Sequence, residues 1–189
     1  MKKNEEILNI PENIKTFIYE NENKYYLKIE GKLGCLEVVI PNLLKLLKDK
    51  NFLKIELISN QKNTKSYENT VIKVFSTYLK NTFRGLSTGF YSDLLIRGTG
   101  YKAIIDKDAQ SIELKIGTTH PVIKKIPSDI NVFYHVKLKK LYISSNDKQK
   151  VTQFSSELRD LKRPDPYKAK GLRRAGEIIK LKEGKKSRK

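Results

Sequence analysis

The same order of predicted elements occurs twice along this chain of 189 residues. Strand-like alternation of apolar residues dominates residues 14–40 and 52–58, and apolar residues at helical spacing then run from Tyr67 to Leu86. A second group of strand-like segments covers residues 93–144, and a second amphipathic helix is predicted over 147–161. The sequence therefore predicts a repeated α+β unit.

A shift of 86 residues superimposes the two groups and nearly superimposes the two predicted helices. Four residue pairs then match in chemical type, namely Gly31 with Gly117, Leu36 with Val122, Ile40 with Ile126, and Pro41 with Pro127. The predicted fold class is α+β, with two similar domains from an internal duplication, each a small, mostly antiparallel sheet packed against a helix.

The segment RGLSTGF at 84–90 marks the predicted boundary, because two glycines and two hydroxyl residues are typical of a helix end and a short linker. This gives an N-terminal α+β domain at 1–86 and a C-terminal α+β domain at 87–163. Residues 164–189 follow as a basic C-terminal extension.

Positive charge increases along the chain. The formal net charge is +18, with ten Lys against nine Asp and Glu in residues 1–60 but twelve cations against four anions in 160–189. An excess of this size is typical of proteins that bind a polyanion or an anionic membrane surface. The interpretation is that the C-terminal part contacts such a partner.

Several classes of protein are disfavoured. Cys35 is the single cysteine, so no disulfide framework is expected, and its strand-like surroundings predict a small apolar core residue. No apolar run approaches the ~20 residues of a membrane span, and the start, MKKNEEILNIPENI, has no apolar signal core. A membrane-surface helix is also disfavoured, because proline and glycine break the most cationic stretch.

Candidate catalytic and metal-binding residues are few. His120 and His135 are the two histidines, no residue pair has zinc-ligand spacing, and no serine lies in a nucleophile elbow. The GTG at 98–100 lacks the third glycine of a dinucleotide-binding loop and has no lysine placed for phosphate. We therefore predict no enzyme activity, cofactor, metal or small-molecule substrate.

The segment RGTGYKA at 97–103 has two possible interpretations. Gly98 and Gly100 inside a predicted strand are typical of a bulge or of close approach by another backbone. Arg97, Tyr101 and Lys102 add charge and an aromatic face that could help to dock a nucleic acid. The equally weighted alternative is a strand bend with solvated cations.

The run RPDPYKAKGLRRAGE at 163–177 is the strongest candidate for binding. Pro164 and Pro166 predict a stiff, extended start, and Gly171 and Gly176 would let the chain turn or a phosphate backbone come close. Tyr167 could cover a sugar or a base. Five cations surround it, namely Arg163, Lys168, Lys170, Arg173 and Arg174. The alternative is a disordered basic tail.

This run resembles the C-terminal signature of the large-subunit ribosomal protein six family of bacterial type, approximately R-P-P-E-P-Y-K-G-K-G-hydrophobic-R-Y. Other segments match the family as well, including IEGKLGCLEVVIP, LLIRGTGYKAIID, GTTHPV and DKQKVTQFSSELRDLKRP. The resemblance covers residues 10–183 or so and is most specific in the C-terminal half.

The resemblance implies two similar α+β domains, the second bound to large-subunit ribosomal RNA near the loop where translation GTPases act. It also implies neighbouring ribosomal proteins as partners and no catalytic activity. The chain lacks the family's usual basic start, and Lys outnumbers Arg 32 to 7. Both features resemble organelle-encoded members, which favours a mitochondrial ribosome, with a plastid or an AT-rich bacterium as alternatives.

The prediction of RNA-binding residues rests on both the sequence pattern and this resemblance. Outside the C-terminal run they are Arg97, Gly98, Gly100, Tyr101, Lys102, His120 of GTTHPV, which matches the histidine of G-x-S-H-P-V in the family, Lys148 of the segment DKQ, and Arg159. In the run they are Arg163, Tyr167, Lys168, Lys170, Gly171, Arg173 and Arg174, with Pro164 and Pro166 as signature residues.

Two residues depart from the family pattern. Ala169 replaces the first glycine of K-G-K-G, which speaks against a very close backbone approach there, and Arg174 replaces a tyrosine.

Two further functions stay open as alternatives. One is a nucleic-acid-binding protein outside the ribosome, and the other is a metal-dependent enzyme acting on RNA, which only diffuse carboxylates support.

Overall fold

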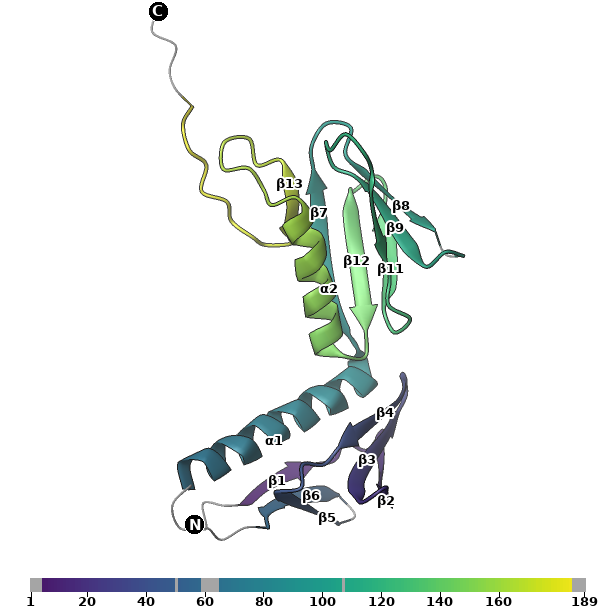
Figure 1. Cartoon of the computed structure of the whole chain (residues 1–189), viewed down its shortest axis with the longest axis vertical. Helices are drawn as coiled ribbons and strands as arrows, with labels where there is room; N and C mark the ends of the chain where they lie inside the picture. Colours follow the sequence, from purple (N-terminus) through teal and green to yellow (C-terminus); the bar gives the residue numbers. More distant parts are fainter. Residues whose placement is uncertain (1–4, 50, 59–64, 107, 185–189) are drawn as a thin grey trace, which may run out of the picture. The chain divides into compact units, whose positions relative to one another are not determined.

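The computed structural model describes residues 5–49, 51–58, 65–106 and 108–184. The chain divides into two compact units, which we call unit 1 (residues 1–89) and unit 2 (residues 90–189). Each unit has its own hydrophobic core, and Figure 1 shows the helices and strands that form each unit.

The described part of unit 1 contains two antiparallel three-stranded sheets and the helix α1 (Lys65–Thr88). One sheet is a meander of β2 (Lys15–Asn21), β3 (Lys24–Gly31) and β4 (Gly34–Val39). The other has the order β1-β6-β5, with β1 at Glu5–Asn9, β6 at Phe52–Leu57 and β5 at Leu44–Lys48. Apolar residues of α1 at helical spacing, Ile72, Phe75, Leu79 and Phe83, are buried against these strands.

Unit 2 repeats this arrangement. Its meander consists of β8 (Lys102–Asp106), β9 (Ser111–Lys115) and β10 (Val122–Lys125). Its second sheet has the order β11-β12-β7-β13, with β11 at Asn131–His135, β12 at Lys140–Ser145, β7 at Phe90–Arg97 and β13 at Gly171–Arg174. The helix α2 (Lys148–Leu161) packs on β7, β12 and β13 (Figure 1).

The strand orders confirm the predicted fold class of two similar α+β units. The order β5-β6-β1 in unit 1 recurs as β11-β12-β7 in unit 2, and each unit has one antiparallel meander. The difference is β13, a fourth strand supplied by the segment that the sequence assigned to a basic extension. The last strand of unit 2 therefore comes from the C-terminal run.

The predicted helices are correct to within two residues, but three strands were not foreseen. Asp147, expected as the first residue of the second helix, is its N-cap, and its carboxylate accepts a hydrogen bond from the Gln149 amide at 2.8 Å. The strands β1, β5 and β13 were missed because their short sequences, such as LKLLK, lack a clear period of two.

Two expectations about the strands are wrong. Residues 93–106 do not form one bulged strand, because the chain leaves β7 at Arg97 and enters β8, in the other sheet, at Lys102. Cys35 is exposed and is not a core residue. Leu36 and Val38 of β4 pack on the core, and because successive side chains of a strand point to opposite faces, Cys35 lies on the other face.

Candidate nucleic-acid interface

The glycines at 98–100 form the connection between the two sheets of unit 2. Gly100 has φ of +75°, and a Cβ at Gly98 would lie 2.5 Å from the Tyr101 ring. A Cβ at Gly117 would lie 2.7 Å from the Tyr101 hydroxyl. Gly98 and Gly117 thus make room for a half-buried tyrosine that packs on the core, so Tyr101 is a packing residue and not an open stacking face. Arg97 and Lys102 at either side are exposed.

Asp165 organises the loop that carries most of the predicted cations. Its two carboxylate oxygens accept hydrogen bonds from the Tyr167 and Lys168 amides at 3.1 and 3.3 Å. Its own amide donates to the Lys170 carbonyl, and its carbonyl accepts from the Ala169 amide, both at 2.9 Å. The predicted stiff, extended segment is therefore a closed turn, which leaves Tyr167 and Lys168 exposed.

Ala169 explains why the signature has a glycine at its position. Its φ is +53°, in the left-handed region, which costs an L-residue about 1–2 kcal/mol. From the sequence, we linked this glycine to the close approach of another backbone. The structure gives a different reason, which is the positive φ of the residue itself. Glycine removes that cost, and alanine bears it.

Gly171 brings the end of the loop against its beginning. A Cβ there would lie 2.7–2.8 Å from the Arg163 and Lys162 carbonyl oxygens and the Pro164 Cα. The next residue, Leu172, donates its amide to the Lys162 carbonyl at 2.8 Å and is fully buried in the core of unit 2. Gly171 therefore serves the closure of the loop, and β13 anchors the run to β7.

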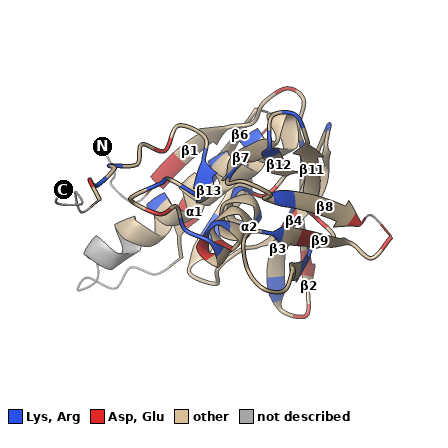
Figure 2. Ribbon diagram, turned by 90° about the horizontal axis from the view of Figure 1, so that it is seen from above, with Lys and Arg blue, Asp and Glu red and all other residues tan. Residues whose placement is uncertain are grey.

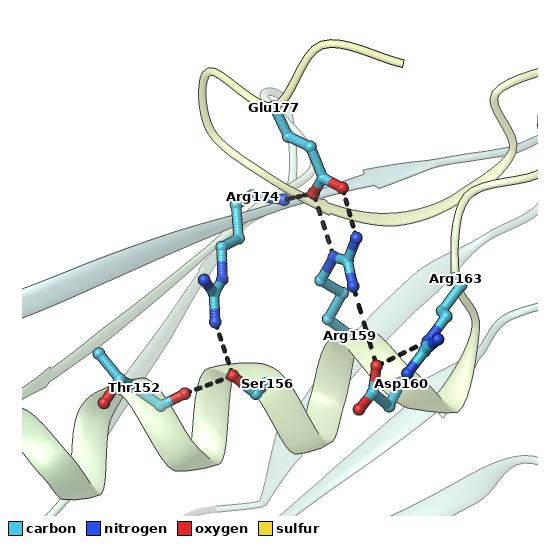
Figure 3. Close-up of polar contacts among 7 residues, drawn as sticks. All are labelled: Thr152, Ser156, Arg159, Asp160, Arg163, Arg174 and Glu177. Atoms are coloured by element: carbon cyan, nitrogen blue, oxygen red, sulfur yellow. Dashed lines mark hydrogen bonds and ion pairs between the residues drawn. The ribbon is translucent and has the colours of Figure 1, made fainter. Parts of the chain in front are cut away.

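Helix α2 holds the chain that follows β13 (Figure 3). Arg159 donates from Nε and Nη2 to the two carboxylate oxygens of Glu177, at 3.1 and 2.5 Å, and the Arg174 amide donates to the same carboxylate at 3.0 Å. The Arg174 guanidinium donates to the Ser156 Oγ at 2.6 Å. We call these four residues the tail clamp. The hydrogen bonds from Arg159 hold the pKa of Glu177 below its usual range.

The tail clamp includes Arg159, which is one of the residues predicted to bind RNA. The sequence predicts it to be an RNA ligand, but both of its hydrogen-bonding edges face carboxylates, since Nη1 also lies 3.8 Å from Asp160. Glu177 and Ser156, which complete the clamp, were not identified. The available signal for Glu177 was its place as the one acid among the cations of residues 168–182.

Replacing Glu177 with glutamine should loosen the tail without unfolding unit 2. A partly exposed ion pair of this kind contributes about 0.5–1 kcal/mol, so tryptic cleavage after Arg174 in the full chain should become about two- to fivefold faster. Because the pKa of Glu177 is lowered, its contribution is present above the ordinary glutamate pKa, about 4.3, and is lost as the pH falls through the lowered value.

The matched control for this change is Glu157→Gln. It removes the charge of a glutamate on α2 that forms an ion pair with Lys124, at 2.8 Å, and not with any described residue of the tail. Cleavage after Arg174 should keep its original rate in this variant. Equal acceleration by the two substitutions would mean that the tail clamp does not hold the tail.

The remaining predicted residues lie apart. Lys148 is exposed at the first turn of α2, about 16 Å along the helix axis from Arg159 at its other end. His120 is exposed between β9 and β10, and its carbonyl accepts a hydrogen bond from the Thr118 hydroxyl. Arg163 is exposed and pairs with Asp160 at 2.8 Å. The structure thus brings together the residues of the C-terminal run but not the whole predicted set.

The protein has two similar α+β units, an excess of positive charge in unit 2 and an ordered cationic loop. These features are typical of a basic protein that binds a partner or has a structural role. Within the described residues, no group of acidic, histidine or cysteine side chains could hold a metal ion, and no helix is long and apolar enough to cross a membrane.

Comparison with known proteins identifies the family. The family model for ribosomal protein L6 matches residues 97–174. The chain is 38% identical to the large ribosomal subunit protein uL6m of Reclinomonas americana, over 95% of both chains. It is 35% identical to uL6 of Hydrogenobaculum sp. (strain Y04AAS1), over 93% of this chain and 91% of the relative. It is 31% identical to uL6c of Arabidopsis thaliana, over 95% and 76%.

The chain belongs to the ribosomal protein L6 family. Its role is that of a structural component of the ribosome, and it is not an enzyme. The family resemblance drawn from the C-terminal signature is thereby confirmed.

Proposed function

We propose that the chain is a structural constituent of the large ribosomal subunit that binds large-subunit rRNA through unit 2 and its C-terminal run. The proposal includes a position near the region where translation GTPases act, contacts with neighbouring ribosomal proteins, and a mitochondrial ribosome as the site of assembly. The relatives are named as large ribosomal subunit proteins and are similar over nearly the whole chain, which supports this assignment.

The distribution of charge carries the proposal. Residues 1–89 contain 15 Lys and Arg against 10 Asp and Glu, whereas residues 90–189 contain 24 against 11. Lys and Arg mark β13 and the chain around it (Figure 2). An RNA backbone would meet its strongest attraction at unit 2, where phosphate contacts supply affinity that depends on salt.

The proposed RNA-binding residues have three different roles in the fold. Direct contacts with RNA would come from the exposed side chains of Arg97, Lys102, His120, Lys148, Arg163, Tyr167, Lys168 and Arg174, and from the half-buried Lys170 and Arg173. Gly98, Gly100 and Gly171 would act by shaping the backbone that presents these side chains. For Arg159 we propose a positioning role, because it holds the tail through Glu177.

Sedimentation of a cell or organelle lysate in high magnesium and then in rising salt tests the proposal. The chain should travel with the large ribosomal subunit through moderate salt washes, and the purified chain should bind large-subunit rRNA with an affinity that falls as salt rises. Free migration at low salt would contradict a structural role. Recovery with mitochondrial ribosomes, and not with plastid or cytoplasmic ones, tests the compartment.

A further inference from the structure

The four-stranded sheet of unit 2 has one face that does not pack on the core. Leu94 and Ile96 of β7 and Leu141 and Ile143 of β12 are fully buried in the core beneath α2. Successive side chains of a strand point to opposite faces, so the intervening residues lie on the other side. We call that side the open face.

Three aromatic rings lie on the open face. Tyr91 on β7 is 79% exposed and Phe133 on β11 is 62% exposed. The ring of Tyr142 on β12 lies between these two strands, 6.3 Å from the Phe133 ring between centroids and tilted by 36°. Exposed rings of this size on a sheet are costly to leave in water, which points to a partner that covers them.

Cations share the face with the rings. Lys140 of β12 and Arg173 of β13 pair with Leu95 of β7 from its two sides, and Arg97 of β7 pairs with Gly171 of β13. Paired residues point to the same face, so the three cations lie on the open face. The Lys140 ammonium lies 4.8 Å from the Tyr142 ring centroid and is paired with Asp93 at 2.6 Å. The Nε of Arg173 is buried and has no hydrogen-bond partner in the described part of the chain. Arg97 is exposed, and among the described residues neither Arg97 nor Arg173 forms an ion pair with an acid, so the charge of these two side chains is not neutralised.

The β2-β3-β4 meander of unit 1 shows that exposed aromatic residues alone do not give this chemistry. Phe17 and Tyr19 are also exposed there, and Tyr19 stacks on Tyr26 at 5.4 Å. Charges of both signs lie near these rings, since the Lys48 ammonium is 5.4 Å from the Phe17 ring centroid, Glu37 interacts with Tyr19, and Lys28 pairs with Glu30 at 3.1 Å. On the described strands of the open face, Lys140, Arg97 and Arg173 accompany one acid, Asp93, whereas the rings of the meander have two acids nearby. The excess of cations on the open face complements an anion that carries flat, apolar rings.

We propose that the open face binds unpaired nucleotides of RNA, with bases stacked on Tyr91 and Phe133 and phosphates bound by Arg97 and Arg173. Base stacking on aromatic side chains requires bases that are not paired in a duplex, and it tolerates different sequences. This inference rests on the proposed rRNA binding and deepens it, because it names the state of the RNA and a surface separate from the loop at 163–170. Tyr91, Phe133, Tyr142 and Lys140 are added to the residues predicted from the sequence.

The full chain with Tyr91→Trp tests stacking directly. The sequence contains no tryptophan, so the new indole is the single one and reports on this face alone. Adding single-stranded dodecauridylate should quench its fluorescence to saturation. The same amount of phosphate in an RNA duplex of twelve base pairs should produce little quenching, since its bases are not free to stack.

A second variant, Tyr91→Ala with Phe133→Ala, should bind dodecauridylate at least tenfold more weakly. The matched control is Phe17→Ala with Tyr25→Ala, which removes two exposed rings of unit 1 and should leave binding unchanged. Circular dichroism of all variants should match the unchanged chain, because the altered side chains project into solvent.

The outcomes separate this inference from the proposed function. If the Tyr91→Trp variant binds large-subunit rRNA without quenching, the inference is overturned and the proposed function still stands. If the double variant binds rRNA normally but fails to join subunits together with other ribosomal proteins, the open face is a protein contact and the inference is again wrong. Failure of the unchanged chain to bind rRNA would overturn both.

Discussion

Replacing Gly171 with alanine should lower the free energy of unfolding of unit 2 by about 3 kcal/mol. The added Cβ would lie within 2.8 Å of three backbone atoms, the Lys162 and Arg163 carbonyl oxygens and the Pro164 Cα. These atoms cannot move apart freely, because the Leu172 amide is bonded to the same Lys162 carbonyl. A φ of +146° adds strain, so the estimate combines ~1–2 kcal/mol of backbone cost with ~1–3 kcal/mol of overpacking.

Urea denaturation of the full chain, followed by circular dichroism, measures this effect. Gly176→Ala is the control, since Gly176 also has a positive φ, +81°, but an added Cβ there would meet no atom within 4 Å. That change should cost ~1–2 kcal/mol of local strain in the tail and leave the unfolding midpoint of unit 2 nearly unchanged. Equal destabilisation by the two substitutions would show that the close contact at Gly171 is unimportant.

Reversing two charges in the loop, by Lys168→Glu with Lys170→Glu, should weaken binding to large-subunit rRNA about 100-fold at ~0.1 M salt. Each lost phosphate contact should also reduce the slope of log affinity against log salt by about 1, so the double variant should lose about 2. The side chains lie on a turn fixed by Asp165 through backbone amides, so their reversal should leave the turn intact. Filter binding across a salt series gives both values.

The control is a second double variant with the same net charge as the loop variant. Lys15→Glu with Lys24→Glu changes two exposed lysines of unit 1 by the same amount. Its effect should be confined to a small, general loss of attraction. If both double variants lose the same affinity and slope, net charge alone governs binding and the loop is not a specific contact.

The comparison of the two units shows how far the sequence could be interpreted. The 86-residue shift matched Gly31 with Gly117, and the strand orders confirm the duplication. The two glycines nevertheless serve different contacts, because a Cβ at Gly31 would meet Leu86 of α1 at 2.7 Å, whereas one at Gly117 would meet Tyr101. A repeat in the sequence predicts equivalent places in the fold, but the neighbour that demands a glycine emerges only from packing.

The candidate site was predictable in outline for the same reason. Proline, glycine and cations in RPDPYKAKGLRRAGE identified the correct segment, since local chemistry determines turns and charge. The ion pair of Arg159 with Glu177 and the pairing of β13 with β7 were not predictable, because both depend on contacts between distant parts of the chain. The rings of the open face were missed because Tyr91, Phe133 and Tyr142 lie on three different strands.

The position of β13 has a consequence for the order in which the protein is made. Synthesis proceeds from the N-terminus, so β7, β12 and α2 emerge well before Gly171 and Leu172 are added. Until then the edge of β7 lacks its partner strand and the core of unit 2 lacks a buried leucine. A nascent chain that stops before residue 171 therefore exposes a strand edge able to pair with other chains, and such truncated products should aggregate or be degraded.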